Sequence, residues 1–274
     1  MPKLIEDARH RASAPSHDGE GASPRPTEPS RARCRARAKT LLTILAALVL
    51  APLTVVVGMG IPGNGYYLSG TLIVLYAIVP FFVAFEGRRP TAREIAVVAV
   101  LTALAVAARA AFVWVPHFKP MAAIIMIAGI AAGPQTGFLV GSVAALASNF
   151  IFGQGPWTPW QMLAFGVVGL VAGLLADARV FPRANLSWPR RVALAVMGFV
   201  LIVGLAGPIL DTSTFFYLST APTPELAATV YLAGLPVNAI HGVATALTLL
   251  VVANPLLDQL ARVRVKYGLL NRSR

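Results

Sequence analysis

The stretch IAVVAVLTALAVAARAAFVWV, residues 95–115, decides the fold class because it is apolar over a spanning length and carries a single charge, Arg109. A helix that crosses a bilayer needs about 20 predominantly apolar residues. The rest of the chain has the same character, since 57% of its 274 residues are hydrophobic and only 12% are charged. This composition excludes most soluble enzymes. The sequence therefore predicts an all-α polytopic protein of the cell (plasma) membrane.

Seven further segments reach or nearly reach spanning length, and short polar or Gly/Pro-containing links separate most of them. They are 41–61, 66–85, 120–133, 138–152, 160–176, 192–210 and 235–253. The segments 120–133 and 138–152 are short for a full crossing, so their existence is better defined than their boundaries.

The basic residues define the topology, because cytoplasmic loops hold most Lys and Arg. With the N-terminus inside, all but two of the 23 Lys and Arg residues are cytoplasmic, in 1–40, 87–94, 177–191 and 254–274. The exceptions are Lys119, in an expected outer loop, and Arg109, within a span. We therefore expect both termini in the cytoplasm. The net charge of +12 then reflects topology and attraction of the basic tails to anionic lipids, with no nucleic-acid partner expected.

Residues 1–40 are rich in Pro, Ser, Ala and Arg, and we expect a disordered, basic cytoplasmic tail. The basic region is too long for a signal peptide, and no small-residue cleavage site follows 41–61, so this span is expected to be retained. The single cysteine, Cys34, excludes an internal disulfide framework and a Cys-based metal cluster.

Arg109 is the most costly residue of the predicted spans, since a buried arginine costs about 2.5–3.5 kcal/mol even on lenient insertion scales. Such a side chain faces protein or a wet cavity, or it reaches back to the outer interface. The same helix carries a ridge of small residues that favours close helix contact. The ridge consists of Ala99, Ala103, Ala107 and Ala111. Arg109 lies on roughly the opposite face, which favours the polar interior.

Two expected outer loops, 114–120 and 150–161, are both aromatic and polar. Their candidate residues, with Asn149 just before the second loop, are His117, Phe118, Lys119, Gln154, Trp157, Trp160 and Gln161. Thr158 followed by a proline and then Gln161 predicts a capping box with Thr158 as the N-cap. The aromatic residues fit an ordinary interfacial belt, but their polar neighbours favour a pocket for a large, partly polar ligand.

The last span carries a polar stripe at helical spacing that begins at its outer end. The stripe consists of Asn238, His241, Thr245 and Thr248. These side chains fit interhelical hydrogen bonds, and Asn238 and His241 fit ligand contacts equally well. The preceding loop, 211–234, has Asp211 at its root. Within it, Thr223 starts a short helix that Gly234 is expected to end, which would form a lid over the outer mouth.

Several chemical devices are missing from the sequence. It contains no phosphate-binding Gly-Lys-Ser/Thr loop, no paired intramembrane carboxylates and no nucleophile elbow. No second His or Cys has metal-ligand spacing with His241. We therefore expect no catalytic residues, no metal and no cofactor. A membrane-embedded hydrolase using Ser142 and His241 lacks its usual sequence context.

Four stretches together resemble the substrate-binding S components of energy-coupling factor (ECF) vitamin transporters, and among these the cobalamin branch most. They are FKP at 118–120, the glycine-rich 129–141, SNF at 148–150 and GQGPWTPWQM at 153–162. The resemblance covers about residues 93–260, and the tryptophan loop is its most specific part. It implies a six-helix core in 93–260, preceded here by two additional transmembrane helices in 41–92 and followed by a basic tail, 261–274.

The resemblance further implies a non-enzymatic binding subunit that captures a vitamin, with cobalamin favoured, for ATP-driven import. Its implied partners are a transmembrane coupling protein and two separate ATPase subunits. Ala99, Ala103 and Ala107 match the family's contact with the coupling protein, and Ala111 extends it. The substrate-binding candidates are Arg109, His117, Phe118, Lys119, Asn149, Gln154, Trp157, Trp160, Gln161, Asp211, Asn238 and His241. Alternatives are another vitamin or a nucleobase-like precursor as cargo, or an ion-coupled secondary carrier.

Overall fold

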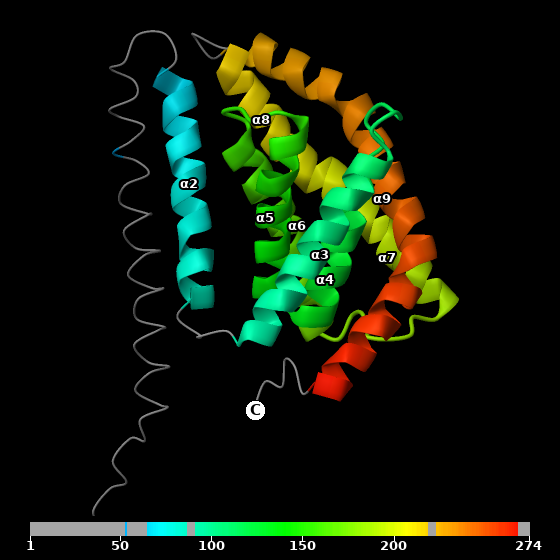
Figure 1. Ribbon diagram of the computed structural model, residues 1–274. Helices are drawn as coiled ribbons and strands as arrows, with labels where there is room; N and C mark the ends of the chain where they lie inside the picture. Colours follow the sequence, from blue (N-terminus) through cyan, green and yellow to red (C-terminus); the bar gives the residue numbers. More distant parts are fainter. Residues whose placement is uncertain (1–52, 54–64, 87–90, 219–222, 268–274) are drawn as a thin grey trace, which may run out of the picture.

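A computed structural model describes residues 65–86, 91–218 and 223–267, together with residue 53 (Figure 1). Every regular element in these ranges is helical, which confirms the predicted fold class. The helices are α2 (Gly65–Glu86), α3 (Ala92–Ala111), α4 (Met121–Ala132), α5 (Pro134–Phe152), α6 (Thr158–Asp177), α7 (Trp188–Leu201), the π-helix η1 (Ile202–Ala206), α8 (Gly207–Leu218) and α9 (Pro224–Tyr267). The expected tail 1–40 and span 41–61 lie outside the described residues.

Five of the described helical segments are long and apolar enough to cross a membrane. They are Ala92–Ala111, Pro134–Phe152, Thr158–Asp177, Trp188–Leu218 and Pro224–Lys266. Of the two spans expected to be short, the second forms a full 19-residue helix that begins at Pro134. The first remains short, as the 12-residue α4.

The short helix α4 lies at the centre of the bundle. It contacts α3, α5, α6, α7 and α9, and every residue from Met121 to Ala131 is buried. Twelve residues rise only about 18 Å, less than the hydrocarbon thickness. Because neighbouring helices rather than lipid surround α4, it does not have to match the bilayer.

Helices α5 and α6 approach each other through glycines. A Cβ at Gly169 would lie 2.2 Å from the carbonyl oxygen of Gly137, and one at Gly141 would lie 2.3 Å from the carbonyl oxygen of Phe165. Without a hydrophobic force between helices in lipid, such close backbone contact supplies much of the packing energy. The glycine-rich sequence therefore fixes the α5–α6 pair, whose outer ends carry part of the candidate site.

Two long helical segments complete the bundle. The chain remains helical from Trp188 to Leu218 through η1, well beyond the expected 192–210. The expectation that Gly234 ends a short helix is wrong, since α9 begins at Pro224 and continues past Gly234 and Pro236. Pro236 removes one helical hydrogen bond but has a helical φ, so it can bend a helix without ending it. Gly234 serves close packing instead, because a Cβ there would lie 2.5 Å from the Asp211 carboxylate.

The two ends of the bundle differ in charge. The loops at 112–120 and 153–157 lie at one end, where the first turns of α9 run across the bundle (Figure 1). The opposite end carries the described Lys and Arg residues other than Arg109 and Lys119. They are Arg93, Arg179, Arg183, Arg190, Arg191, Arg262, Arg264 and Lys266. This distribution follows the positive-inside rule, and we call the less basic end the outer end.

Helix α2 packs beside the remaining bundle against α5, α6 and α8. Trp160 of α6 is buried in this contact, and its indole Nε1 donates to Thr71 Oγ1 of α2 at 3.3 Å. Val74, Ile78 and Phe138 form the buried apolar cluster around the indole. The division into two additional helices and a six-helix core stays a prediction, since the first additional span is not described.

Candidate functional site at the outer end

Arg109 lies in the last turn of α3, where a cation interacts favourably with the helix dipole. Its guanidinium Nη1 donates to Ser148 Oγ and, at 3.1 Å, to Asn149 Oδ1 of α5. The guanidinium carbon lies 4.6 Å from the centroid of the Phe152 ring, which adds a cation–π contact. Arg109 therefore faces protein rather than the outer interface, and α5 supplies its partners.

Asn149 connects three helices. It is almost completely buried, with 1% of its surface exposed. While its carbonyl oxygen accepts from Arg109, its amide Nδ2 donates to Thr158 Oγ1 at 2.9 Å and to Gln161 Oε1 at 2.8 Å. A polar network thus joins the outer ends of α3, α5 and α6.

The expected capping box at Thr158 is wrong. The N-cap of α6 is Trp157, and no side chain caps this helix. Thr158 Oγ1 instead donates to Gln154 Oε1 at 3.0 Å, and both Thr158 and Gln161 accept from Asn149. The Thr158 and Gln161 side chains therefore accept hydrogen bonds from a neighbouring helix instead of capping their own, because α5 brings the buried Asn149 amide within reach.

A second set of residues joins α9 to the start of α4. His241 of α9 is 7% exposed, its ring centroid lies 5.7 Å from that of Phe165, and the ring interacts with the backbone of Lys119. Its Nε2 is buried and has no hydrogen-bond partner within the described ranges. Lys119, Arg109 and His117 lie close enough to interact electrostatically with the ring. We call these four residues the outer basic cluster.

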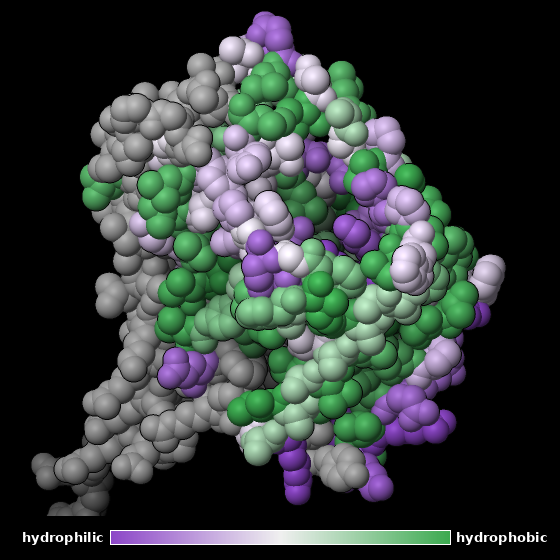
Figure 2. All heavy atoms as spheres, turned by 45° about the horizontal axis from the view of Figure 1, so that its top comes forward, coloured by the Kyte–Doolittle hydropathy of each residue, from purple (hydrophilic) through white to green (hydrophobic). Residues whose placement is uncertain are grey.

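Lys119 lies in the loop between α3 and α4 and is partly buried. Burial lowers the pKa of its ammonium group, and the nearby charge of Arg109 lowers it further. His117 in the same loop is exposed and has a positive φ of 60°. The loop thus brings the Lys119 ammonium group and the His117 imidazole to the outer end, and Figure 2 shows hydrophilic residues around a hollow in this part of the surface.

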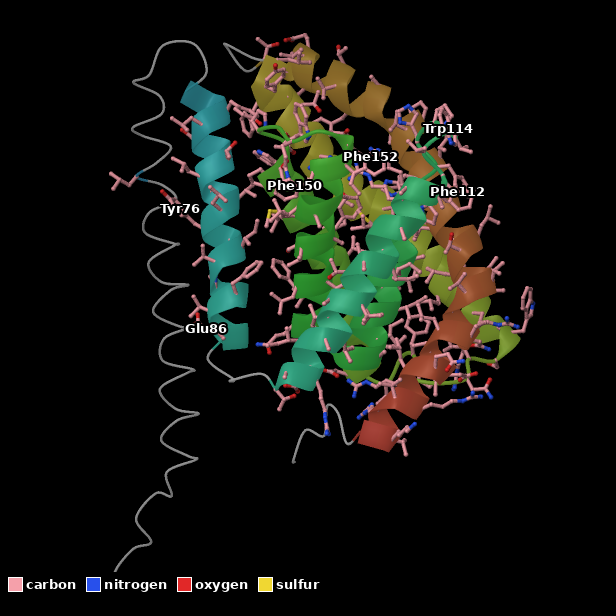
Figure 3. The ribbon with its side chains drawn as sticks, in the orientation of Figure 1. Tyr76, Glu86, Phe112, Trp114, Phe150 and Phe152 are labelled. Carbon is pink, nitrogen blue, oxygen red and sulfur yellow. The ribbon has the colours of Figure 1, made fainter. Side chains whose placement is uncertain are left out.

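Four other candidate residues make their contacts outside this cluster. Trp160 belongs to the α2 contact, and Phe118 packs on Phe112 with ring centroids 5.0 Å apart. Asn238 Nδ2 donates to Asp211 Oδ2 at 2.9 Å, and the hydroxyl groups of Thr212 and Tyr231 are also hydrogen-bonded. Both contacts connect the first part of α9 to α8. Figure 3 shows Phe112 and Trp114 at the end of α3 and Phe150 and Phe152 at the end of α5.

Gln154 and Trp157 shape the loop before α6. The Gln154 amide donates to the carbonyl of Leu146 at 3.1 Å, which ties the loop back to α5. The Trp157 ring lies against Gly155 and is 43% exposed, so it remains accessible at the outer end.

The small-residue ridge of α3 has no partner within the described bundle. All four of its alanines, Ala99, Ala103, Ala107 and Ala111, are exposed. Arg109 binds α5 on another face of the same helix. Helix α3 therefore presents a face of small residues away from the bundle and a polar face toward α5.

Sequence reasoning missed several residues that complete the site. Ser148 and Phe152 hold Arg109, and Phe165 flanks His241. Ser148 was detectable as a second polar residue next to Asn149. The aromatic residues give no such signal, because apolar residues are common in every span.

The helices and their charge distribution define a polytopic α-helical membrane protein with a polar outer end. Residues 90–262 match the family described as ECF-type riboflavin transporter, S component. The match covers more than half of the chain, and the chain belongs to this family.

Three relatives carry only the designation UPF0397 protein. That of Vibrio atlanticus (strain LGP32) is 31% identical over 104 residues, 37% of this chain and 53% of that protein. That of Clostridium perfringens (strain SM101 / Type A) is 25% identical over 156 residues, 55% of this chain and 76% of that protein. That of Aliivibrio fischeri (strain MJ11) is 36% identical over 56 residues, which are 20% of this chain and 30% of that protein. The chain thus spans about half the length of the Vibrio relative. No solved structure matches it.

Proposed function

We propose that this chain is the membrane-embedded, substrate-binding component of an ECF-type transporter and captures a vitamin from outside the cell. The observation that carries the proposal is the outer end itself. There, a chain that is otherwise largely apolar between its ends gathers a partly buried network of Arg109, Asn149 and Gln161 beside the outer basic cluster. Intramembrane polar groups are costly, and their concentration at one mouth is typical of a ligand site.

The favoured cargo is cobalamin. The resemblance to the cobalamin branch over about residues 93–260 supports this choice, and the tryptophan loop at 153–162 is the most specific part of the family resemblance. The exposed Trp157 suits a large ring system. Riboflavin is the competing cargo, because the family description names it. Both ligands combine an extended ring system with polar substituents, which fits aromatic residues next to amide and cationic groups.

Energy for import is supplied by partners in this proposal. The exposed ridge of Ala99, Ala103, Ala107 and Ala111 is the surface that would dock a transmembrane coupling protein, since small side chains let another helix approach closely. ATP hydrolysis would occur on two separate ATPase subunits. The basic tails would bind anionic lipids of the inner leaflet.

Ligand binding by the purified full chain tests the cargo. A corrinoid colours the protein that binds it, so we expect coloured protein after incubation with cobalamin and removal of free ligand, with saturable heat in calorimetry. Riboflavin is titrated in parallel. Saturable riboflavin binding without a response to cobalamin would replace the cargo, and absence of binding to both would contradict the capture of either vitamin.

A further inference from the structure

The outer basic cluster brings the cations Arg109 and Lys119 together with two imidazoles, without a carboxylate among the described residues around it. Arg109 comes from α3, His117 and Lys119 from the loop before α4, and His241 from α9. Within the described ranges, neither Arg109 nor Lys119 forms an ion pair; Arg109 is bound by neutral side chains of α5. Cations that are partly buried without a counter-ion are unfavourable, so the cluster is suited to receive one.

The acidic groups of the outer end are engaged or placed elsewhere. The Asp211 carboxylate accepts from Asn238 and packs against Gly234. Glu225 is exposed in the first turn of α9. Neither carboxylate is among the groups that act on His241 or Lys119.

His241 provides an independent observation. Its side chain is more than nine-tenths buried, and its Nε2 has no hydrogen-bond partner in the described part of the chain. A buried polar atom normally finds a partner, so an unpaired one beside the charges of Arg109 and Lys119 indicates a missing acceptor or donor. Because the other ring nitrogen, Nδ1, makes the contact with the Lys119 backbone, Nε2 donates a hydrogen bond when the ring is imidazolium, the form that a bound anion stabilises.

The start of α4 adds positive potential at the same place. Lys119, whose backbone contacts the His241 ring, lies two residues before the first residue of α4. No side chain caps this helix, and Pro120 and Met121 are buried. Backbone N–H groups at a helix start favour an anion, which complements the side-chain charges.

We propose that the cargo presents an oxyanion, a phosphate or a carboxylate, to Arg109, Lys119 and His241 at the start of α4. This inference rests on the proposed function, and it specifies the ligand class of that site. It separates the two vitamins, because cobalamin carries a phosphodiester whereas riboflavin carries no anionic group unless it is phosphorylated.

The first experiment uses the anion alone. Thermal unfolding of the full chain is measured in phosphate, in acetate and in chloride at equal ionic strength. We expect a saturable rise of Tm with phosphate or acetate, and the more effective of the two identifies the group. Lys119→Gln should weaken the apparent affinity for that anion roughly 10- to 100-fold, as expected for loss of a charge-assisted hydrogen bond. The matched control Arg190→Gln, at the opposite end, should leave it unchanged.

Absence of a specific rise in Tm, or equal weakening in Lys119→Gln and Arg190→Gln, would overturn the proposal. Arg109→Lys is also measured. It keeps the positive charge, so the site can still be tested if Arg109→Gln does not fold. It should retain anion binding better than Arg109→Gln, and an equal loss in both would count against a role of charge.

The second experiment compares cobalamin with cobinamide, which lacks the phosphodiester. Cobalamin should bind roughly 10- to 100-fold more tightly, and the difference should vanish in Lys119→Gln. Equal affinities would overturn the oxyanion proposal while leaving corrinoid capture intact. Specific anion binding without corrinoid binding would support the oxyanion site and refute the cobalamin assignment.

Discussion

Replacing Asn149 by alanine removes the residue that connects α3, α5 and α6. The change deletes the acceptor for Arg109 and the donor for Thr158 and Gln161. Arg109 keeps Ser148 and Thr158 keeps Gln154, so the loss is partial. Interhelical hydrogen bonds in membranes average about 0.6 kcal/mol and reach about 1.7 kcal/mol. Losing two or three of them should lower the free energy of unfolding by about 1–3 kcal/mol.

The loss of ligand affinity should be specific to Asn149, whereas a loss of stability is expected at any residue that bridges two segments. With Asn149 absent, the Arg109 guanidinium loses one of its two side-chain hydrogen-bond acceptors and is no longer held in a fixed orientation. We expect cobalamin binding to weaken roughly 10- to 100-fold, the effect of one misplaced charged hydrogen bond. Calorimetric titration of the purified variant measures the affinity, and thermal unfolding in the same detergent measures the stability.

Asn254→Ala is the matched control. Asn254 in α9 also bridges two segments, since its amide accepts from the backbone N–H of Leu186 and donates to the carbonyl of Leu186, both at 2.9 Å. It lies at the inner end, so its loss should lower stability and leave affinity unchanged. Wild-type affinity in Asn149→Ala, or equal weakening in both variants, would refute the assignment of the network to the ligand site.

Three further substitutions test other parts of the account. Trp157→Ala should weaken ligand binding about tenfold through lost aromatic contact, as measured by titration. The control is Trp188→Ala, which removes an exposed tryptophan at the inner end, and equal effects of the two substitutions would contradict the assignment. Ala103→Leu should reduce co-purification with the coupling protein without changing ligand affinity, and the reverse result would mean that the two faces of α3 are exchanged. Gly169→Val should abolish folded protein in detergent, as judged by gel filtration, because its Cβ would lie 2.2 Å from a carbonyl oxygen. Gly204→Ala should fold normally, because its Cβ would meet nothing within 4 Å apart from the adjoining helix backbone, and equal yields would argue against the glycine contact.

Hydropathy and charge were sufficient for the helical fold and its orientation, because both depend on composition averaged over a span. The described basic residues other than Arg109 and Lys119 lie at one end, as expected. Helix ends were harder to predict. Gly234 looks like a stop signal in sequence, but Asp211 of a neighbouring helix requires a residue without a Cβ there. The reason lies in tertiary packing, which the local sequence does not record.

The site was predictable as a region but not as a set of contacts. The orientation of Arg109 toward a polar interior followed from its position opposite the alanine ridge, and the structure shows it bound to α5. Trp160 looked equivalent to Trp157 in the same loop, yet it is buried against α2. Each residue along a helix turns the side chain by about 100°. Whether a tryptophan three residues further along faces the outer mouth or a neighbouring helix therefore depends on where that helix packs, which the local sequence does not record.

ATP-dependent uptake measures the central claim most directly. The chain is reconstituted in liposomes with its host's coupling protein and ATPases, and labelled cobalamin uptake is followed with and without ATP. The account predicts that uptake requires ATP and all partner subunits and is lost in Ala103→Leu. Uptake by this chain alone, driven only by an ion gradient, would contradict it and would instead identify an ion-coupled secondary carrier.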